Sequence, residues 1–116
     1  MLVFGPQTPI YIAIDPVDFR FGIDGLARCC RTLLSQDPMA GSAFVFRNRS
    51  RTAIKILNYD GQGFILTHKR FSSGRLAWWP KSGESSVAVP ARELQVLLHN
   101  GSPEKANMAR DWRPVT

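Results

Sequence analysis

Cysteine and histidine are scarce in this chain, which has two adjacent cysteines, Cys29 and Cys30, and two histidines, His68 and His99. Adjacent cysteines on a helix point in different directions and cannot form an ordinary disulfide. Without a second thiol pair or nearby histidines, they do not make a zinc site either. We therefore expect reduced, partly buried thiols in a cytoplasmic protein, with no metal and no other cofactor.

Long apolar runs are also missing. No run approaches the roughly 20 residues that a membrane-spanning helix needs. The first nine residues lack the basic segment and the long apolar segment of a secretory signal. We expect a cytoplasmic protein without membrane contact.

Acidic side chains are few relative to basic ones: nine Asp and Glu stand against fifteen Lys and Arg, a net charge of +6 in 116 residues. Such a surplus attracts polyanions over long distances, and DNA, RNA and anionic membranes are the candidates. Apolar residues make up 44% of the chain, enough for the core of one ordinary domain. We expect a single α+β domain over residues 1–101 and a polar C-terminal tail over residues 102–116.

Short runs of β-branched and aromatic residues predict strands. The tight Asp60-Gly61 turn is a strong hairpin signal between two of them. Around position 55, Ile54 and Ile56 should face one side of the sheet, and Lys55 and Leu57 the other. The predicted strands cover residues 10–14, 43–47, 54–59, 63–70 and 76–79.

Apolar residues three and four positions apart predict two helices. The second begins at Pro90 and ends at Gly101, a natural C-cap. The order β-α-β-β-β-β-α predicts an α+β fold, a mostly antiparallel sheet (β-meander) covered by two helices. The apolar stripes are Ile23, Leu26, Ala27, Cys30, Leu33 and Leu34 in the first helix, and Leu94, Leu97 and Leu98 in the second.

The first candidate binding feature is a group of arginines at a predicted hairpin tip. Arg47, Arg49 and Arg51 alternate along the chain and are followed by Lys55. In an extended segment this spacing places the three guanidinium groups on one side, where they can grip phosphate oxygens with paired donors. The structural alternative is a charged loop that keeps the hairpin soluble and protects the sheet edge.

A second basic cluster comprises Lys69, Arg70 and Arg75, closely followed by Trp78 and Trp79. Basic residues interleaved with aromatic rings suit phosphate neutralisation combined with base stacking. The alternative for at least one tryptophan is the core, since so small a domain needs large rings inside. We expect one tryptophan to be buried and include Trp78 among the nucleic-acid-binding candidates.

Catalytic patterns are weak in this sequence. Asp15, Asp18 and Asp24 could hold two metal ions for phosphoryl transfer, but a turn and a helix start explain Asp15 and Asp24. His68 next to Lys69 and Arg70 could serve a small metal-independent ribonuclease, but a histidine on a strand beside two basic residues is more often a surface polar residue. We expect a non-enzymatic protein, with the ribonuclease as an alternative.

A series of short motifs follows in a fixed order between Ile10 and Pro80. The motifs are Asp15-Pro16-Val17-Asp18-Phe19-Arg20, Gly22-Ile23-Asp24-Gly25-Leu26-Ala27, Asp37-Pro38 with Gly41, Phe44-Val45-Phe46-Arg47-Asn48-Arg49, Lys55-Ile56-Leu57, Asp60, Gly63, Lys69-Arg70, Gly74-Arg75 and Trp78. No single motif is specific, but the ordered set is, and it resembles the TnpB-type accessory protein of the insertion-sequence family numbered sixty-six.

The resemblance implies a role in transposition beside a separate, larger transposase that carries the acidic catalytic site. We expect an accessory protein that assists transposition by binding nucleic acid, DNA above all, or the transposase and other element-encoded proteins, or both. A free sheet edge could also pair two copies of the chain into a homo-oligomer. The alternative is a protein-interaction subunit without direct nucleic-acid contact, its positive charge matching an acidic partner surface.

Overall fold

The computed structural model describes residues 7–99 of the chain, in which five strands and two helices follow one another in the predicted order. The predicted Gly101 cap and the tail over residues 102–116 lie outside the described residues. The elements are β1 (Ile10–Ala13), α1 (Ile23–Thr32), β2 (Ala43–Arg47), β3 (Ala53–Tyr59), β4 (Phe64–Arg70), β5 (Ser86–Val89) and α2 (Ala91–Leu98).

The strands form one sheet in the order β4-β3-β2-β1-β5, which confirms a mostly antiparallel sheet. The meander of β2, β3 and β4 is antiparallel throughout, and β5 pairs antiparallel with β1. The remaining pair, β1 with β2, is parallel, with Tyr11 opposite Phe44. A parallel pair needs a long crossover connection, and here that connection contains α1.

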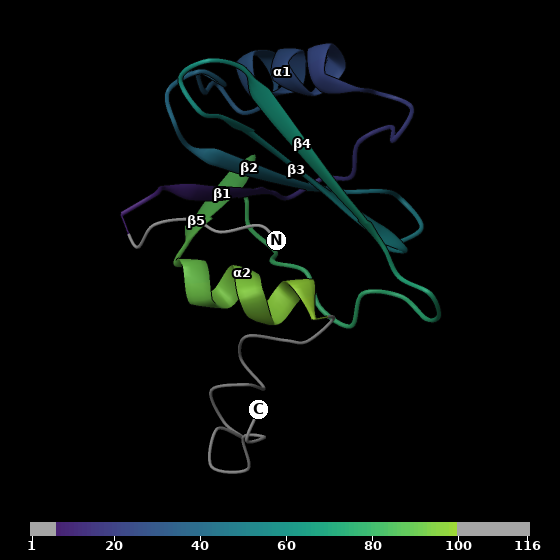
Figure 1. The fold of residues 1–116 in the computed structure, drawn as a ribbon. Helices are drawn as coiled ribbons and strands as arrows, with labels where there is room; N and C mark the ends of the chain where they lie inside the picture. Colours follow the sequence, from purple (N-terminus) through teal and green to yellow (C-terminus); the bar gives the residue numbers. More distant parts are fainter. Residues whose placement is uncertain (1–6, 100–116) are drawn as a thin grey trace.

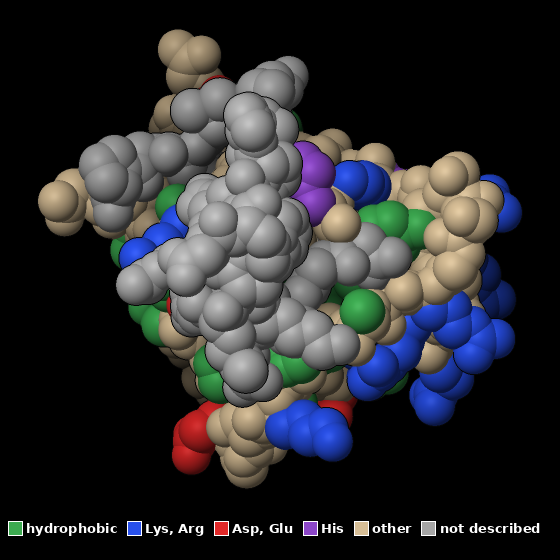
Figure 2. Space-filling view, turned by 90° about the horizontal axis from the view of Figure 1, so that it is seen from below, with side chains coloured by type: hydrophobic (Ala, Val, Ile, Leu, Met, Phe, Trp, Pro, Cys, Tyr) green, Lys and Arg blue, Asp and Glu red, His purple; other side chains and the backbone are tan. Residues whose placement is uncertain are grey.

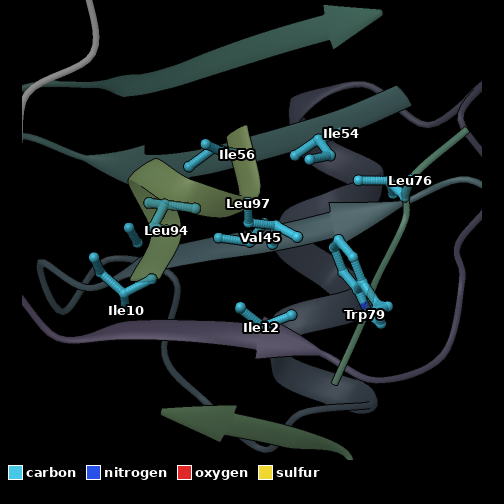
Figure 3. Packing of buried hydrophobic residues seen from close by; sticks show 10 residues of the cluster. Ile10, Ile12, Val45, Ile54, Ile56, Leu76, Trp79, Leu94 and Leu97 are labelled. Atoms are coloured by element: carbon cyan, nitrogen blue, oxygen red, sulfur yellow. The ribbon is translucent and has the colours of Figure 1, made fainter. Parts of the chain in front are cut away.

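The sheet lies between the two helices, as Figure 1 shows, with α1 on one face and α2 on the other. Alternate residues of β1, β2 and β3 supply the two cores, because successive side chains point to opposite faces. The core under α2 is shown in Figure 3 and contains Ile10, Ile12, Ala43, Val45, Ile54, Ile56, Leu76, Trp79, Leu94 and Leu97. The core under α1 contains Ala13, Leu26, Ala27, Cys29, Cys30, Leu34, Phe44, Phe46 and Leu57.

The predicted strand at residues 76–79 is wrong, and the last strand lies ten residues later. Leu76 and Trp79 are both buried in the core under α2 without belonging to a strand. The Trp79 indole Nε1 donates a hydrogen bond to the carbonyl of Ala13, 2.9 Å away. The apolar run therefore marked a core segment rather than a strand, and a short apolar run cannot distinguish the two.

The first helix ends earlier than its apolar stripe suggests. Thr32 is its last residue, and Leu33 forms the C-cap with 59% of its surface exposed. Ser35 then adopts a left-handed backbone conformation with φ at 53°, which turns the chain away from the helix axis. The prediction that Leu33 belongs to the buried stripe is therefore wrong, whereas Leu34 is buried as expected.

Both cysteines are buried and free, in agreement with the sequence-based prediction of reduced thiols. Burial raises the pKa of the Cys30 thiol to about 12, and the pKa of Cys29 is raised for the same reason. A thiol with a raised pKa carries little thiolate, so neither is a reactive nucleophile near neutral pH. Within residues 7–99, neither helix has the length and apolar character of a membrane span.

Candidate nucleic-acid interface

The side chain of Asn48 organises the β2–β3 turn, residues 48–52. Its Oδ1 accepts hydrogen bonds from the backbone N–H groups of Thr52 and Ala53, at 2.9 and 3.2 Å. Its Nδ2 donates to the hydroxyl of Thr52 at 2.8 Å. The hydrogen bonds of the Asn48 amide fix the shape of the turn. Arg49 and Ser50 are exposed at its tip.

A second segment, residues 71–76, lies directly against this turn. The backbone N–H of Phe71 donates to the carbonyl of Thr52 at 3.0 Å, and that of Leu76 donates to the carbonyl of Arg51 at 2.8 Å. Residues on either side of these contacts are thereby brought to the same corner of the sheet. The structure thus joins the two basic clusters that are about twenty residues apart in sequence.

Four of the predicted binding residues lie at this corner: Arg49, Arg51, Arg70 and Arg75, called here the basic corner. Arg51 is half-buried and the other three are exposed. Figure 2 shows basic side chains gathered along the right-hand margin of the molecule, with no acidic side chain between them on this face. Within residues 7–99 the only ion pair joins Arg20 to Asp18, so none of the carboxylates in this part of the chain pairs directly with the basic corner.

Arg47 lies next to the basic corner but is partly buried. Its guanidinium carbon is 5.8 Å from the ring centroid of Trp79, and Nη1 donates to the carbonyl of Asn48 at 3.1 Å. Burial lowers the pKa of Arg47, and the nearby Arg51 lowers it further, whereas Asp15 opposes the shift. Arg47 therefore adds positive potential behind the corner while its side chain is held by the protein.

Lys55 is not at the surface where the sequence-based prediction placed it. Only 7% of its surface is exposed, and its ammonium donates to the carbonyls of Phe19 and Phe21 at 2.8 and 3.0 Å. The ammonium also lies 4.9 Å from the ring centroid of Phe19. These contacts hold the segment before α1 against the sheet, so Lys55 is a positioning residue and does not belong to the basic corner.

Lys69 and Trp78 are also separated from the basic corner. The ammonium of Lys69 donates to the carbonyl of Leu98 in α2 and lies 5.6 Å from the ring centroid of Phe71. Trp78 is half-buried and packs against the core under α2. Trp79 is the buried tryptophan, so the prediction that one of the two belongs to the core is confirmed.

An open hollow of about 530 Å³ adjoins the basic corner. One wall is the segment between β1 and α1, and the other is the β2–β3 turn; the backbone N–H of Val17 joins them by donating to the carbonyl of Arg47 at 3.0 Å. The hollow is lined by Pro16, Val17, Asp18, Phe19, Asn48, Arg49 and Ser50.

Asp18, at the rim of the hollow, is held by its neighbour Arg20. The carboxylate accepts from the backbone N–H and the guanidinium of Arg20, with a shortest distance of 2.7 Å. These hydrogen bonds lower the pKa of Asp18 to about 2. Asp18 therefore stays ionised at neutral pH.

The aspartates and histidines considered for catalysis do not belong to a metal-holding cluster. Within the described part of the chain, no group of three or more His, Cys, Asp or Glu side chains could hold a metal ion. His68 lies beside Phe19, with ring centroids 5.7 Å apart. Burial, Lys55 and Arg70 all lower the pKa of His68. The imidazole is thus favoured in its neutral form.

The sequence showed the basic residues but not the hollow. The motif that contains Val17 and Phe19 was noted only as part of a family resemblance, and its contact with the β2–β3 turn joins positions 30 residues apart. The available sequence signal for the hollow was the turn expected at Asp15-Pro16, because it directs the chain out of β1 toward the β2–β3 turn. Nothing local to Lys55 indicated that its ammonium would reach two carbonyls.

The fold is a sheet between two helices with an exposed basic corner. The chain belongs to the family of IS66 Orf2-like proteins, whose family model matches residues 8–108. It is therefore related to the accessory proteins of insertion sequences.

Two uncharacterized proteins of Sinorhizobium fredii are similar to this chain. The protein y4hO is 33% identical over 115 residues, which cover 99% of this chain and 97% of the relative. The protein y4jC is 38% identical over 89 residues, which cover 77% of this chain and 75% of the relative. No solved structure matches the chain.

Proposed function

We propose that the protein assists transposition as a non-catalytic subunit that binds the phosphate backbone of element DNA through the basic corner. The observation that carries the proposal is the placement of Arg49, Arg51, Arg70 and Arg75 on adjoining backbone segments, with none of the carboxylates of residues 7–99 paired to them. Guanidinium groups bind phosphate oxygens with two parallel donors and remain charged at any physiological pH. Membership of an insertion-sequence family makes element DNA the natural polyanion.

The architecture of the corner supports contact with a backbone rather than with base edges in a groove. Arg49 and Arg51 lie in the β2–β3 turn, Arg70 ends β4 and Arg75 lies in the loop that follows it, so none of the four belongs to a helix that could enter a groove. Phosphate contacts of this kind position a protein on nucleic acid without reading its sequence. We therefore propose binding with little sequence preference, in which the transposase supplies the recognition of element ends.

The test is a titration of fluorescent duplex DNA with the full chain at several salt concentrations. Four phosphate contacts should give a slope of about −3 to −4 in a plot of log affinity against log salt. Arg49→Gln combined with Arg75→Gln should make the slope less steep by about 2. The matched control is Arg28→Gln combined with Arg31→Gln, which removes the same charge from the exposed face of α1.

Equal slopes for the two double variants would contradict the proposal, because net charge alone would then explain binding. Absence of DNA binding would favour the alternative of a subunit that contacts only the transposase or another element-encoded protein. Such a subunit could use the exposed apolar side chains that follow α1, Leu33 at its C-cap and Met39 in the connection to β2, which are 59% and 52% exposed.

A further inference from the structure

The hollow beside the basic corner has two walls of different chemistry. Pro16, Val17 and Phe19 contribute apolar surface from the segment between β1 and α1. Arg49 contributes a guanidinium from the β2–β3 turn and also belongs to the basic corner. A ligand that occupies the hollow therefore meets apolar surface inside and positive charge at the edge toward the corner.

We propose that this hollow receives one unpaired nucleobase from the strand whose phosphates the basic corner binds. The inference rests on the proposed function. Sites for unpaired nucleic acid combine basic groups that follow the backbone with apolar or aromatic surface on which bases stack. The hollow and the basic corner provide these two parts side by side, with Arg49 shared between them.

The lining of the hollow suits a base better than a phosphate. The carboxylate of Asp18 lines the hollow and is paired with the guanidinium of Arg20 at 2.7 Å, so this pair offers a phosphate no net attraction. The apolar side chains beside it offer a phosphate no hydrogen-bond donor, whereas a base can stack on them. A nucleobase is neutral, and its amino groups can donate to a carboxylate oxygen.

The walls of the hollow are held in place before any ligand binds. Lys55 anchors the carbonyls of Phe19 and Phe21, and the N–H of Val17 is bonded to the carbonyl of Arg47. On the other side, Asn48 organises the turn that carries Arg49. A preformed site loses little conformational freedom on binding, so stacking contributes more fully to affinity.

The experiment compares three labelled duplexes of the same length by fluorescence anisotropy with the full chain. One is fully paired, one carries a single bulged adenine, and one carries an abasic site in place of that adenine. The wild-type protein should bind the bulged adenine about tenfold more tightly than the abasic bulge. Val17→Gln should remove this preference and leave affinity for the paired duplex unchanged, whereas Ile65→Gln, at an exposed apolar position on β4, should retain it.

Equal affinity of the wild-type protein for the adenine bulge and the abasic bulge would overturn the inference and leave the proposed function intact if binding still weakens with salt. Binding to none of the duplexes would remove the proposed function, and the inference with it. If Val17→Gln retains the base preference and instead loses capture of the transposase, the hollow is a protein site and the inference is wrong. The affinities of the wild-type protein for the adenine bulge and the abasic bulge test the inference even if Val17→Gln does not fold.

Discussion

The β2–β3 turn and the β3–β4 turn use the same local device in different surroundings. In each, the oxygen of a short polar side chain accepts two backbone N–H groups: Asn48 from Thr52 and Ala53, Asp60 from Gln62 and Gly63. The difference lies beyond the turn. The β3–β4 turn is closed by contacts within residues 60–63, whereas the β2–β3 turn also receives hydrogen bonds from residues 71 and 76.

The comparison shows that a tight hairpin does not need arginines at its tip. Asp60, Gly61 and Gln62 form a turn without a single basic side chain, and Gly61 supplies the left-handed conformation with φ at 98°. The β2–β3 turn places Arg51 in that strained region instead, with φ at 63°. A turn of this kind therefore does not require arginines at its tip, which is consistent with the role that we propose for their charge.

The largest expected loss of stability is at Lys55, which lies near the start of β3, the end next to the β2–β3 turn. Lys55→Met removes hydrogen bonds to two carbonyls at a position with 7% exposure, and should lower the free energy of unfolding by about 2–3 kcal/mol. Urea denaturation measures the loss, with Lys81→Met, at an exposed lysine, as the control. If both variants are equally stable, Lys55 does not anchor the segment before α1.

A smaller loss is expected at the Asn48 amide. Asn48→Ala removes two acceptor contacts and one donor contact in a half-buried turn, and should cost about 1–2 kcal/mol. Asn48→Asp keeps the acceptor oxygen and should recover part of the loss, since the new carboxylate also faces Arg47 and Arg49. Thermal unfolding of the three proteins provides the ranking. A fully stable Asn48→Ala variant would mean that residues 71–76 hold the turn without the amide.

The smallest effect is a titration confined to the β3–β4 turn. Hydrogen bonds from Gln62 and Gly63 lower the pKa of Asp60 below its usual 3.8. A carboxyl group whose pKa is lower in the folded chain stabilises the fold above the unfolded value, and this contribution is lost as the pH falls through the folded pKa.

Amide NMR shifts of Gln62 and Gly63 should therefore change as the pH falls below about 4, whereas those of Thr52 and Ala53 should change little because an amide does not titrate. Asp60→Asn should abolish the change at residues 62 and 63. Parallel titration of both turns would show that acid loosens the whole sheet and not one turn.

Much of the fold could be predicted from short-range patterns. Alternation placed Ile54 and Ile56 on one face of β3 and Leu57 on the other, as the two cores confirm. The Asp60-Gly61 turn was also correct, since its residue types favour the backbone conformation that a tight hairpin needs. The segment from Leu76 to Trp79 was misread because its apolar residues are buried by distant parts of the chain.

Part of the candidate site could be predicted, because charge is visible in the sequence and arginines seldom lie buried. Arg49, Arg70 and Arg75 are exposed as that reasoning requires. Lys55 could not be assigned, because its partners are carbonyls 34 and 36 positions away. The hollow was equally hidden, since it exists only where residues 16–19 meet the β2–β3 turn.

The sequence by itself determined the positive charge of the protein, the order of its elements and the face on which most strand residues lie, because these follow from composition and from periodicity over a few neighbours. Only the tertiary structure decided that β5 pairs with β1, that Lys55 is buried and that Arg70 and Arg75 join the β2–β3 turn. These features depend on backbone groups far apart in the chain, whose pairing is selected by packing of the whole domain and not by local preference.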